Sequence, residues 1–330
     1  MTKTLDLRGQ VRRVTSIVPC YNLAKYIGEC VEGLVHQVTQ YEHEILVCDD
    51  ASTDESVAIL KRLASHFNNV RLLKNPNNVG LVCTMRRLLD EASGDCIAYM
   101  DGDDVALPGK IQALAGHLDR YFNCAIAYHD VEIFHSDTGL TTGLYSSNFY
   151  NAEHIPDSAS VDHLLIHGVF LQASSVMFRA HGEFERILDH GCKIICDYPL
   201  HLGNALVIGG SIDKVPGVFG RYRIHNSSFG AQTRKSVERR QAVTRDLILA
   251  ATHARALGAS ADSVTKSYLH SFFSAALYFL RAGEDGLFIQ NLKHSLRLSS
   301  QLDWSPDERL EILRAHQDDP DYLRTCDLWR

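Results

Sequence analysis

Several features that define large classes of protein are missing from this sequence. None of its apolar runs approaches the ~20 residues that a membrane-spanning helix needs. The N-terminal stretch, MTKTLDLRGQVRRV, has no apolar core of the kind found in a signal peptide. We therefore expect a cytoplasmic protein without a transmembrane segment. The sequence leaves open a peripheral contact with the inner face of the membrane.

An excess of positive charge is missing too. The 330 residues contain 33 Lys and Arg against 40 Asp and Glu, and the formal net charge of −7 argues against general nucleic-acid binding. The nine cysteines mostly stand singly among apolar residues, as reduced and buried cysteines do. Cys192 and Cys196 lie close together in CKIIC, but no second pair at zinc-site spacing accompanies them. We expect no metal at that pair.

Two glycine-rich phosphate-binding motifs are also absent. No G-x-G-x-x-G follows the first expected strand, where PCYNLAKYIG stands instead, and no G-x-x-x-x-G-K-[ST] occurs. These absences argue against a Rossmann oxidoreductase and against a P-loop NTPase. A phosphate-bearing ligand would then be held through a metal.

Short apolar runs alternate with helical patterns through the first third of the chain. The runs at residues 14–18, 44–48, 70–73 and 96–100 predict strands, and the apolar spacing between them predicts helices. Nearly every residue in these runs is apolar, as in strands that helices cover on both faces. The pattern predicts an α/β fold with a doubly wound parallel sheet. Ligands of such sheets bind at the carboxyl ends of the strands.

The pattern changes further along the chain. Helices and short strands mix up to about residue 232, and only helical patterns follow. We therefore expect one α/β domain over residues 1–232. A C-terminal α-helical lobe would cover residues 233–330.

Two acidic clusters follow expected strands. Asp49 and Asp50 end one run, and Asp101, Asp103 and Asp104 follow another in IAYMDGDDV. Repulsion and desolvation oppose such clusters, so a partner of opposite charge should lie nearby. Mg²⁺ or Mn²⁺ would neutralise DGDD, although a solvated acidic turn is an alternative. The first pair could bind a nucleobase or ribose, or one member could cap the next helix.

These segments together resemble the inverting family 2 glycosyltransferases, which have the GT-A fold. The matching segments are SIVPCYN, EILVCDDASTDES, NPNNVG and ASGDCIAYMDGDD, in order, over about residues 13–130. A looser match continues to about residue 228, and the helical tail lies outside it. The resemblance implies a GT-A sheet with helices on both faces, a nucleotide-sugar donor, most often a UDP-sugar, and Mn²⁺ or Mg²⁺. It also implies that residues 1–232 consist of a nucleotide-binding half at about 13–130 and an acceptor half at about 131–232.

The resemblance also implies roles for single residues. Those at the nucleotide-sugar would be Pro19, Tyr21, Asp50, Asp101, Asp103 and Arg223. Those at the metal would be Asp103, Asp104 and His225. Asp197 falls where the family carries its general base, but Cys196 replaces the acidic residue that often precedes it. Asp197 could instead cap a helix, and His225 could be an ordinary structural histidine.

One segment departs from the family pattern. After NVG the family commonly shows small residues with Arg-Asn, whereas this chain has LVCTMRRLL. Arg86 or Arg87 could contact a phosphate instead, and a solvated helix face is an equal alternative.

The sequence therefore predicts a metal-dependent, inverting transfer of a sugar to a hydroxyl of a saccharide or glycoconjugate, as in polysaccharide biosynthesis. Asp197 would take the hydroxyl proton, and the metal would offset charge on the leaving group. A nucleotidyltransferase that forms sugar nucleotides is an alternative, but it usually has a basic, glycine-rich stretch after the first strand. A non-catalytic binding module is another, and it would need no base.

Two further expectations concern specificity and the lobe. The hydroxyl contacts that select the substrate are expected from residues 136–158 and 168–179. The helical lobe could orient the acceptor, form a homodimer, or dock on a protein or a membrane surface.

Overall fold

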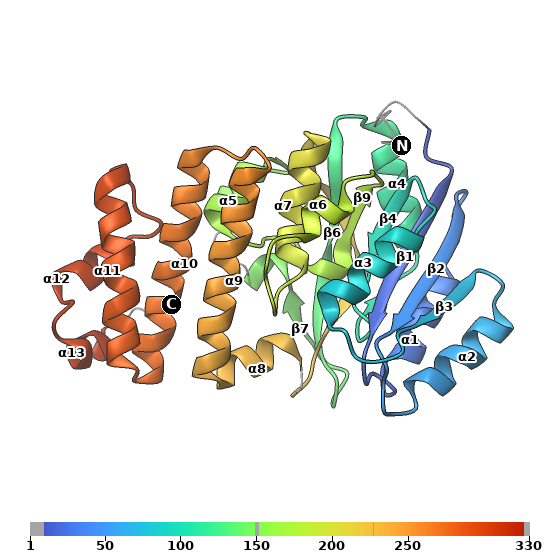
Figure 1. Ribbon diagram of the computed structural model, residues 1–330, viewed down its shortest axis with the longest axis horizontal. Coiled ribbons are helices and arrows are strands. Elements are labelled where there is room, and N and C mark those ends of the chain that lie inside the picture. The colour runs from blue at the N-terminus through green and yellow to red at the C-terminus, as the bar shows by residue number, and fades with distance from the viewer. Residues whose placement is uncertain (1–9, 149–151, 227, 327–330) are drawn as a thin grey trace. The chain divides into compact units, whose positions relative to one another are not determined.

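The computed structural model describes residues 10–148, 152–226 and 228–326 (Figure 1). The chain forms two compact units. The first contains the chain up to Ser160 together with Val169–Asp189 and Gly203–His225. The second contains Val161–Gly168, His190–Leu202 and the chain from Asn226 onward. The chain therefore passes between the units several times, a path that the sequence pattern did not indicate. The predicted domain boundary at residue 232 stays a prediction.

The first unit is built on a mixed sheet of ten strands among the described residues. Along the main path, the order is β3 (Val70–Lys74), β2 (Glu42–Asp49), β1 (Arg13–Cys20), β4 (Cys96–Tyr99), β9 (Val176–Arg179), β6 (Cys124–His135), β10 (Ser211–Ile224) and β5 (Val105–Ala106). Two short strands lie off this path, β7 (Thr141–Leu144) beside β6 and β8 (Ser158–Ala159) beside β10.

The direction of the strands agrees with the predicted α/β class. Strands β3, β2, β1 and β4 are parallel, and β6 and β10 are parallel to each other. Strand β9 runs antiparallel between β4 and β6. The mostly parallel sheet with its helices confirms the predicted fold class.

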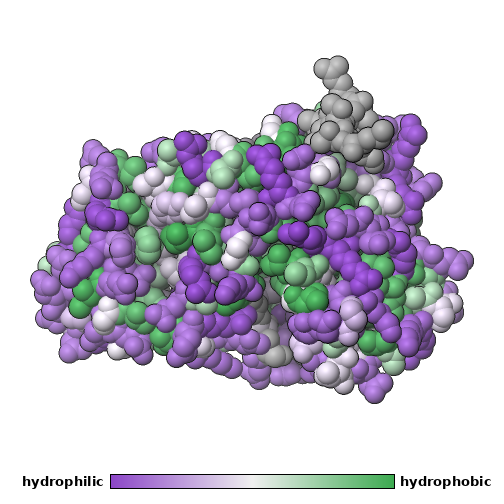
Figure 2. All heavy atoms as spheres, viewed as in Figure 1, coloured by the Kyte–Doolittle hydropathy of each residue, from purple (hydrophilic) through white to green (hydrophobic). Residues whose placement is uncertain are grey.

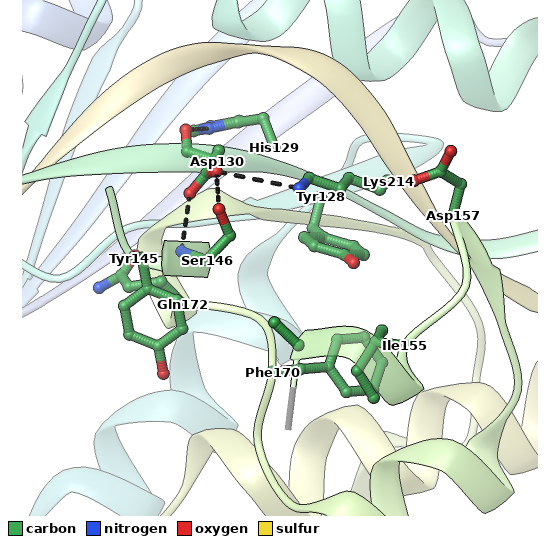
Figure 3. A pocket seen from close by; sticks show the side chains of 11 residues that line it. Tyr128, His129, Asp130, Tyr145, Ser146, Ile155, Asp157, Phe170, Gln172 and Lys214 are labelled. Atoms are coloured by element: carbon green, nitrogen blue, oxygen red, sulfur yellow. Dashed lines mark hydrogen bonds and ion pairs between the residues drawn. The ribbon is translucent and has the colours of Figure 1, made fainter. Parts of the chain in front are cut away.

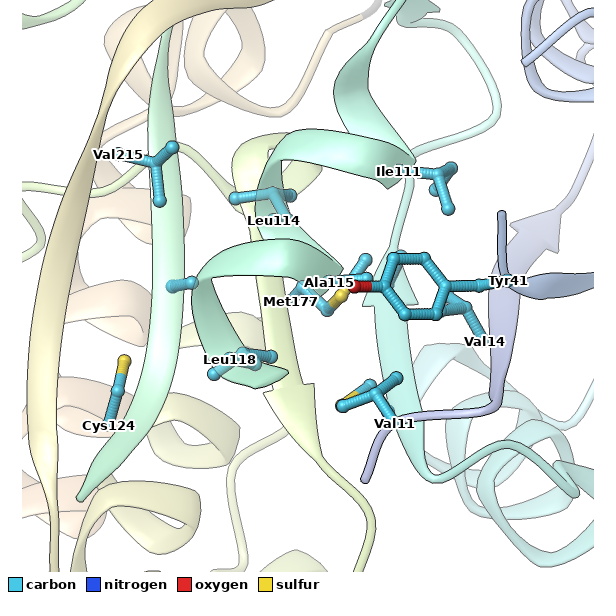
Figure 4. Packing of buried hydrophobic residues seen from close by; sticks show 13 residues of the cluster. Val11, Val14, Tyr41, Ile111, Leu114, Ala115, Leu118, Cys124, Met177 and Val215 are labelled. Carbon is cyan, nitrogen blue, oxygen red and sulfur yellow. The ribbon is translucent and has the colours of Figure 1, made fainter. Parts of the chain in front are cut away.

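Helices cover the sheet because their apolar positions recur at helical spacing. Those of the first unit are α1 (Ile27–Val35), α2 (Ser56–His66), α3 (Leu81–Glu91), α4 (Lys110–Arg120) and α6 (Phe184–Leu188). In α4, Ile111, Leu114 and Leu118 share one face and pack with Val14 and Met177 of the sheet (Figure 4). Burying each such side chain contributes roughly 1.5–3 kcal/mol, so this cluster fixes α4 on β1 and β9.

The second unit is helical. Its helices are α5 (Val161–His167), α8 (Phe229–Lys235), α9 (Val237–Ala256), α10 (Ala261–Ala282), α11 (Asp285–Leu302), α12 (Arg309–Ala315) and α13 (Pro320–Thr325), and α7 (Asp197–Ile208) begins in it. Helix α10 lies between α9 and α11 (Figure 1). The Ser260 hydroxyl accepts the Ser263 N–H at the start of α10, and Gly283 ends it in the left-handed region. The predicted helical C-terminal region is confirmed.

None of the described helices has the length and apolar character needed to cross a membrane. Figure 2 shows mostly hydrophilic residues on the face that it displays, with apolar residues in small groups between them.

Candidate active site

The sheet register brings the predicted nucleotide-binding residues to one edge. Cys20 of β1 pairs with Asp49 of β2, and Ile17 of β1 pairs with Tyr99 of β4. The residues that follow these parallel strands therefore lie together at their carboxyl ends. Pro19 is buried within β1, whereas Tyr21 is 47% exposed just beyond it.

Polar side chains tie together the loops after β1 and β2. The Asn22 N–H donates to the Ser52 hydroxyl at 2.9 Å, and the Asn22 side-chain oxygen accepts the Thr53 N–H at 2.8 Å. Asn22 and Ala51 both adopt left-handed backbone, with φ of 54° and 58°. Asparagine tolerates this region, but an alanine there is strained, and such strain often marks binding sites.

The Asp50 carboxylate binds the NPNNVG turn, residues 75–80. Its carboxylate accepts hydrogen bonds from the Asn75 amide at 2.7 Å and from the Val79 and Gly80 N–H groups at 3.0 and 2.9 Å. These bonds fix the NPNNVG turn beside β2. The neighbouring Asp49 accepts from one N–H, while its buried Oδ1 has no hydrogen-bond partner among the described residues.

The glycine of DGDD allows a close approach to β1. A Cβ on Gly102 would lie 2.8 Å from Cδ1 of Leu23 and 3.0 Å from the Pro19 carbonyl oxygen. The first distance is too short for a real Cβ and the second is tight, so a side chain here would displace the Leu23 side chain and press on the backbone of β1.

Asp104 is the most enclosed carboxylate of the motif, at 1% exposure. It accepts hydrogen bonds from the Ser174 hydroxyl at 2.6 Å, the Gln172 amide at 2.9 Å and the Arg223 N–H at 2.9 Å. Burial, and next the charge of Asp103, raise the pKa of Asp104 to about 7, although these bonds oppose the shift. Metal ligation by Asp104 stays a prediction, and these three bonds argue against it.

Asp101 and Asp103 are less enclosed. The Tyr99 hydroxyl donates to Asp101 at 2.7 Å, and the Asp101 N–H donates to the Ser174 hydroxyl at 2.9 Å. Asp103 Oδ2 lies 2.8 Å from Nε2 of His225, and 22% of the Asp103 side chain is exposed. A carboxylate oxygen and an imidazole nitrogen at this spacing are suitable ligands for Mn²⁺. The predicted metal residues Asp103 and His225 are therefore adjacent and fit a divalent cation.

A fully buried lysine offsets part of this negative charge. Lys110 opens α4, and its ammonium group donates to the Ser174 carbonyl oxygen and contacts the Met100 sulfur. Burial lowers the pKa of Lys110 to about 8, while the nearby Asp104 opposes that shift. The sequence analysis did not identify Lys110.

Arg223 supplies a second cation. Its Nε donates to the Asp103 carbonyl oxygen at 2.6 Å, and its Nη2 pairs with Glu29 at 2.5 Å. The guanidinium lies 4.9 Å from the ring centroid of Tyr26, which the His225 ring also contacts at 4.8 Å. Lys110, Arg223 and His225 thus lie around the acidic strand end. They are the partners that the sequence analysis expected near the DGDD carboxylates.

Arg86 and Arg87 differ in their environments. Arg87 donates to the Lys74 carbonyl oxygen and to the Asn75 side chain, both at 2.7 Å, and so supports the NPNNVG turn. Arg86 lies 3.9 Å from Glu185 and is partly exposed. A phosphate contact by either residue stays a prediction.

Asp197 is the first residue of α7. Burial raises its pKa, and backbone hydrogen bonds at the helix start oppose the shift.

The segment just before Asp197 is held by a residue that the sequence analysis missed. The fully buried Asp246 of α9 accepts the N–H groups of Lys193, Ile194 and Ile195 at 2.9, 2.6 and 3.2 Å on one oxygen.

A cavity of about 70 Å³ is lined in part by residues of the segments 136–158 and 168–179, which the sequence analysis linked to substrate specificity. Figure 3 shows Tyr128 projecting toward Ile155 and Phe170 across it, with Asp130 bonded to Ser146 at its side. Gln172 also lines the cavity. Its amide nitrogen bonds Asp104, while its buried Oε1 has no partner among the described residues. Gln172 therefore connects the cavity to DGDD.

Comparison with known families agrees with this geometry. The sequence profile of glycosyl transferase family 2 matches residues 15–164, the part of the chain that carries all the acidic strand ends described above. The chain contains a family 2 glycosyltransferase domain. The predicted family is confirmed.

Relatives of the family 2 domain cover only part of the chain. The uncharacterized protein Mb1547 of Mycobacterium bovis is 30% identical over 207 residues, which are 62% of this chain and 57% of that protein. The putative glycosyltransferase EpsE of Bacillus subtilis is 32% identical over 33% of this chain and 39% of its own length. The chain therefore spans little more than half of the mycobacterial relative and well under half of EpsE.

Solved structures share the fold over nearly the whole chain. TarS 1–349 of S. aureus, in complex with UDP-GlcNAc, has a TM-score of 0.63 at 17% identity and covers 95% of this chain and 90% of its own. The mannosyltransferase PcManGT of Pyrobaculum calidifontis, with GDP-Man and Mn²⁺, has a TM-score of 0.55 at 18% identity, over 98% and 86% of the two chains. At these identities the likeness establishes the fold.

Proposed function

We propose that this chain transfers a sugar from a nucleotide-sugar, most simply a UDP-sugar, to a hydroxyl of a saccharide or glycoconjugate. The family 2 match over residues 15–164 supports glycosyl transfer, and the likeness to structures that hold UDP-GlcNAc or GDP-Man supports a nucleotide-sugar donor. The observation that carries the proposal is the partly exposed Asp103, which lies 2.8 Å from the largely buried His225 side chain and follows the carboxyl end of β4.

In this proposal, Asp103 and His225 hold Mn²⁺ or Mg²⁺. The metal, when bound, offsets the charge that develops on the leaving nucleoside diphosphate. Asp104 acts as a positioning residue, because it fixes the backbone at Arg223, two residues before His225. The Arg223 side chain in turn holds the Asp103 carbonyl oxygen.

The rest of the edge is proposed to bind the nucleoside. Pro19 and Tyr21 line the base and the ribose, and Asp50 hydrogen-bonds the base. Asp103 also contacts the ribose, and Asp101 lies at the same strand end and contacts the nucleotide-sugar.

Asp197 is proposed to take the proton from the acceptor hydroxyl as that oxygen attacks the anomeric carbon. Burial raises the pKa of Asp197, and a higher pKa makes a carboxylate a stronger base near neutral pH. One direct displacement inverts the anomeric carbon, so no protein nucleophile is required.

The cavity beside Gln172 is proposed to receive one substituent of a substrate sugar. Its volume of about 70 Å³ suits a small group rather than a whole sugar ring. The apolar side chains of Ile155 and Phe170 can contact a carbon face, while Gln172 Oε1 can accept from an N–H or O–H group. This assignment agrees with the expectation that residues 136–158 and 168–179 select the substrate.

The Asp197→Asn variant tests catalysis separately from binding. We expect UDP binding to remain unchanged and sugar transfer to fall by at least ~100-fold, since a positioned base contributes about 10²–10⁴. The measurements are UDP titration calorimetry and UDP release from donor sugars with a panel of saccharide acceptors. Asp189→Asn is the matched control. Transfer at the wild-type rate in Asp197→Asn would remove Asp197 from this role.

The same assays distinguish the alternatives. A nucleotidyltransferase would release pyrophosphate from a nucleoside triphosphate and a sugar phosphate. A non-catalytic module would bind UDP and release nothing from any donor. We also propose that the protein works in polysaccharide biosynthesis and lies in the cytoplasm, in contact with the inner face of the membrane. A homodimer through the helical lobe is a further proposal.

A further inference from the structure

A second group of metal-binding side chains lies at the opposite edge of the sheet. His117 of α4, Cys124 of β6 and Asp213 of β10 each place one ligand atom within 4.8 Å of the other two. The register separates this group from DGDD. Ile97 of β4 and Ile126 of β6 both pair with Phe178 of β9. Cys124 therefore lies at the amino ends of these strands, whereas DGDD follows the carboxyl end of β4.

We propose that His117, Cys124 and Asp213 form a zinc site, which is independent of the proposed glycosyl transfer. Thiolate, imidazole and carboxylate are the three ligand types that proteins use for Zn²⁺. Three protein ligands leave a fourth position for water. The site would link α4 to the first residues of β6 and β10.

The surroundings of the three residues suit such a site. Asp213 Oδ2 lies 2.9 Å from His117 Nε2, and its Oδ1 accepts the Ser158 hydroxyl at 2.7 Å, a bond that orients the carboxylate. The buried Arg179 donates to the Cys124 carbonyl oxygen at 3.0 Å and so holds the start of β6. Burial, and next the charge of Asp213, raise the pKa of the Cys124 thiol, while the charge of Arg179 opposes this rise. The His117 and Asp213 side chains are 17% and 13% exposed, so an ion can enter from solvent.

Binding needs only small movements. A tetrahedral zinc ion would hold its ligand atoms roughly 3.3–3.7 Å apart, given Zn–N, Zn–O and Zn–S bonds of about 2.0–2.3 Å. The His117–Asp213 pair would open slightly, and the Cys124 sulfur would exchange its hydrogen bond to the Ile126 carbonyl oxygen for the metal. Cys124 is the first residue of β6, and Figure 4 shows it at the margin of the cluster that α4 forms. The thiol proton passes to solvent as the zinc–sulfur bond forms.

Cobalt titration gives a direct test, because a cobalt thiolate shows a near-ultraviolet charge-transfer band. The full chain carries Cys83→Ser throughout, since Cys83 is exposed and could bind metal adventitiously. We expect a band that saturates at one Co²⁺ per chain and is displaced by Zn²⁺. Cys124→Ser should lose this band, whereas the buried control Cys96→Ser should keep it.

Two further variants keep the test decisive if Cys124→Ser folds poorly. His117→Gln and Asp213→Asn retain the thiol and should weaken Co²⁺ binding at least ~10-fold. A cobalt band that is absent from the parent chain, or that survives in folded Cys124→Ser, would mean that the three residues form only a hydrogen-bonded network. UDP binding in the presence of Mn²⁺ should stay unchanged in Cys124→Ser, so failure of this proposal is distinct from failure of the proposed function.

Discussion

At the scale of the residue, Asp104 shows how the fold accommodates a carboxylate at a buried strand end. Three donors meet its oxygens, and Lys110 lies close enough to interact with its charge. Each donor comes from a segment distant in sequence, so Asp104 gains its hydrogen bonds only when the sheet has formed. The neighbouring carboxylates of DGDD repel one another, and such local conflicts are common at functional sites.

This environment predicts a pH dependence of stability. Because the pKa of Asp104 is raised to about 7, the folded chain binds this proton more tightly than the unfolded chain does. The Asp104 contribution to the free energy of unfolding therefore falls as pH rises from about 4 to about 7 and is constant above that range. Asp104→Asn should reduce this slope, measured by urea unfolding at several pH values.

The exposed Asp137 supplies the control for that experiment, because its side chain is 78% exposed. Asp137→Asn should leave the slope unchanged. An Asp104→Asn slope equal to that of the wild type would show that Asp104 is ionised throughout this pH range.

At the scale of the element, α9 determines the shape of the segment that leads to Asp197. Asp246 accepts three consecutive N–H groups from residues 193–195, and the Cys192 thiol donates to the Asp246 carbonyl oxygen. This arrangement gives the helical region a role in positioning the proposed base. The sequence analysis had no means of choosing among its possible roles.

Asp246→Asn tests this positioning role. An asparagine can keep one acceptor but loses the charge that favours three N–H donors, so we expect a loss of about 1–3 kcal/mol in stability. If Asp197 is the base, kcat should fall more than KM rises, and UDP binding should not change. Asp262→Asn, on an exposed part of α10, is the matched control. Equal kinetics in Asp246→Asn and wild type would refute the positioning role.

Sequence reasoning recovered elements and motifs better than side-chain partners. Apolar runs predicted β1 to β4, because most residues of β1, β2 and β4 are buried on both faces, and acidic residues marked the carboxyl ends of β2 and β4. Lys110 and Gln172 were missed, since nothing within α4 or the segment before β9 marks their contacts around DGDD. Lys110 donates to the Ser174 carbonyl oxygen, 64 positions away, and Gln172 donates to Asp104, 68 positions away. The return of residues 190–202 to the helical unit was missed for the same reason.

At the scale of the whole molecule, the central claim is that the family 2 domain binds a nucleotide through a metal at Asp103 and His225. The most direct measurement is titration calorimetry of UDP, GDP and dTDP, each with Mn²⁺ and with EDTA, on wild type and Asp103→Asn. We predict micromolar binding of one nucleotide that requires Mn²⁺ and disappears in Asp103→Asn. No binding of any nucleotide with Mn²⁺ present, or equal binding in Asp103→Asn, would contradict the account.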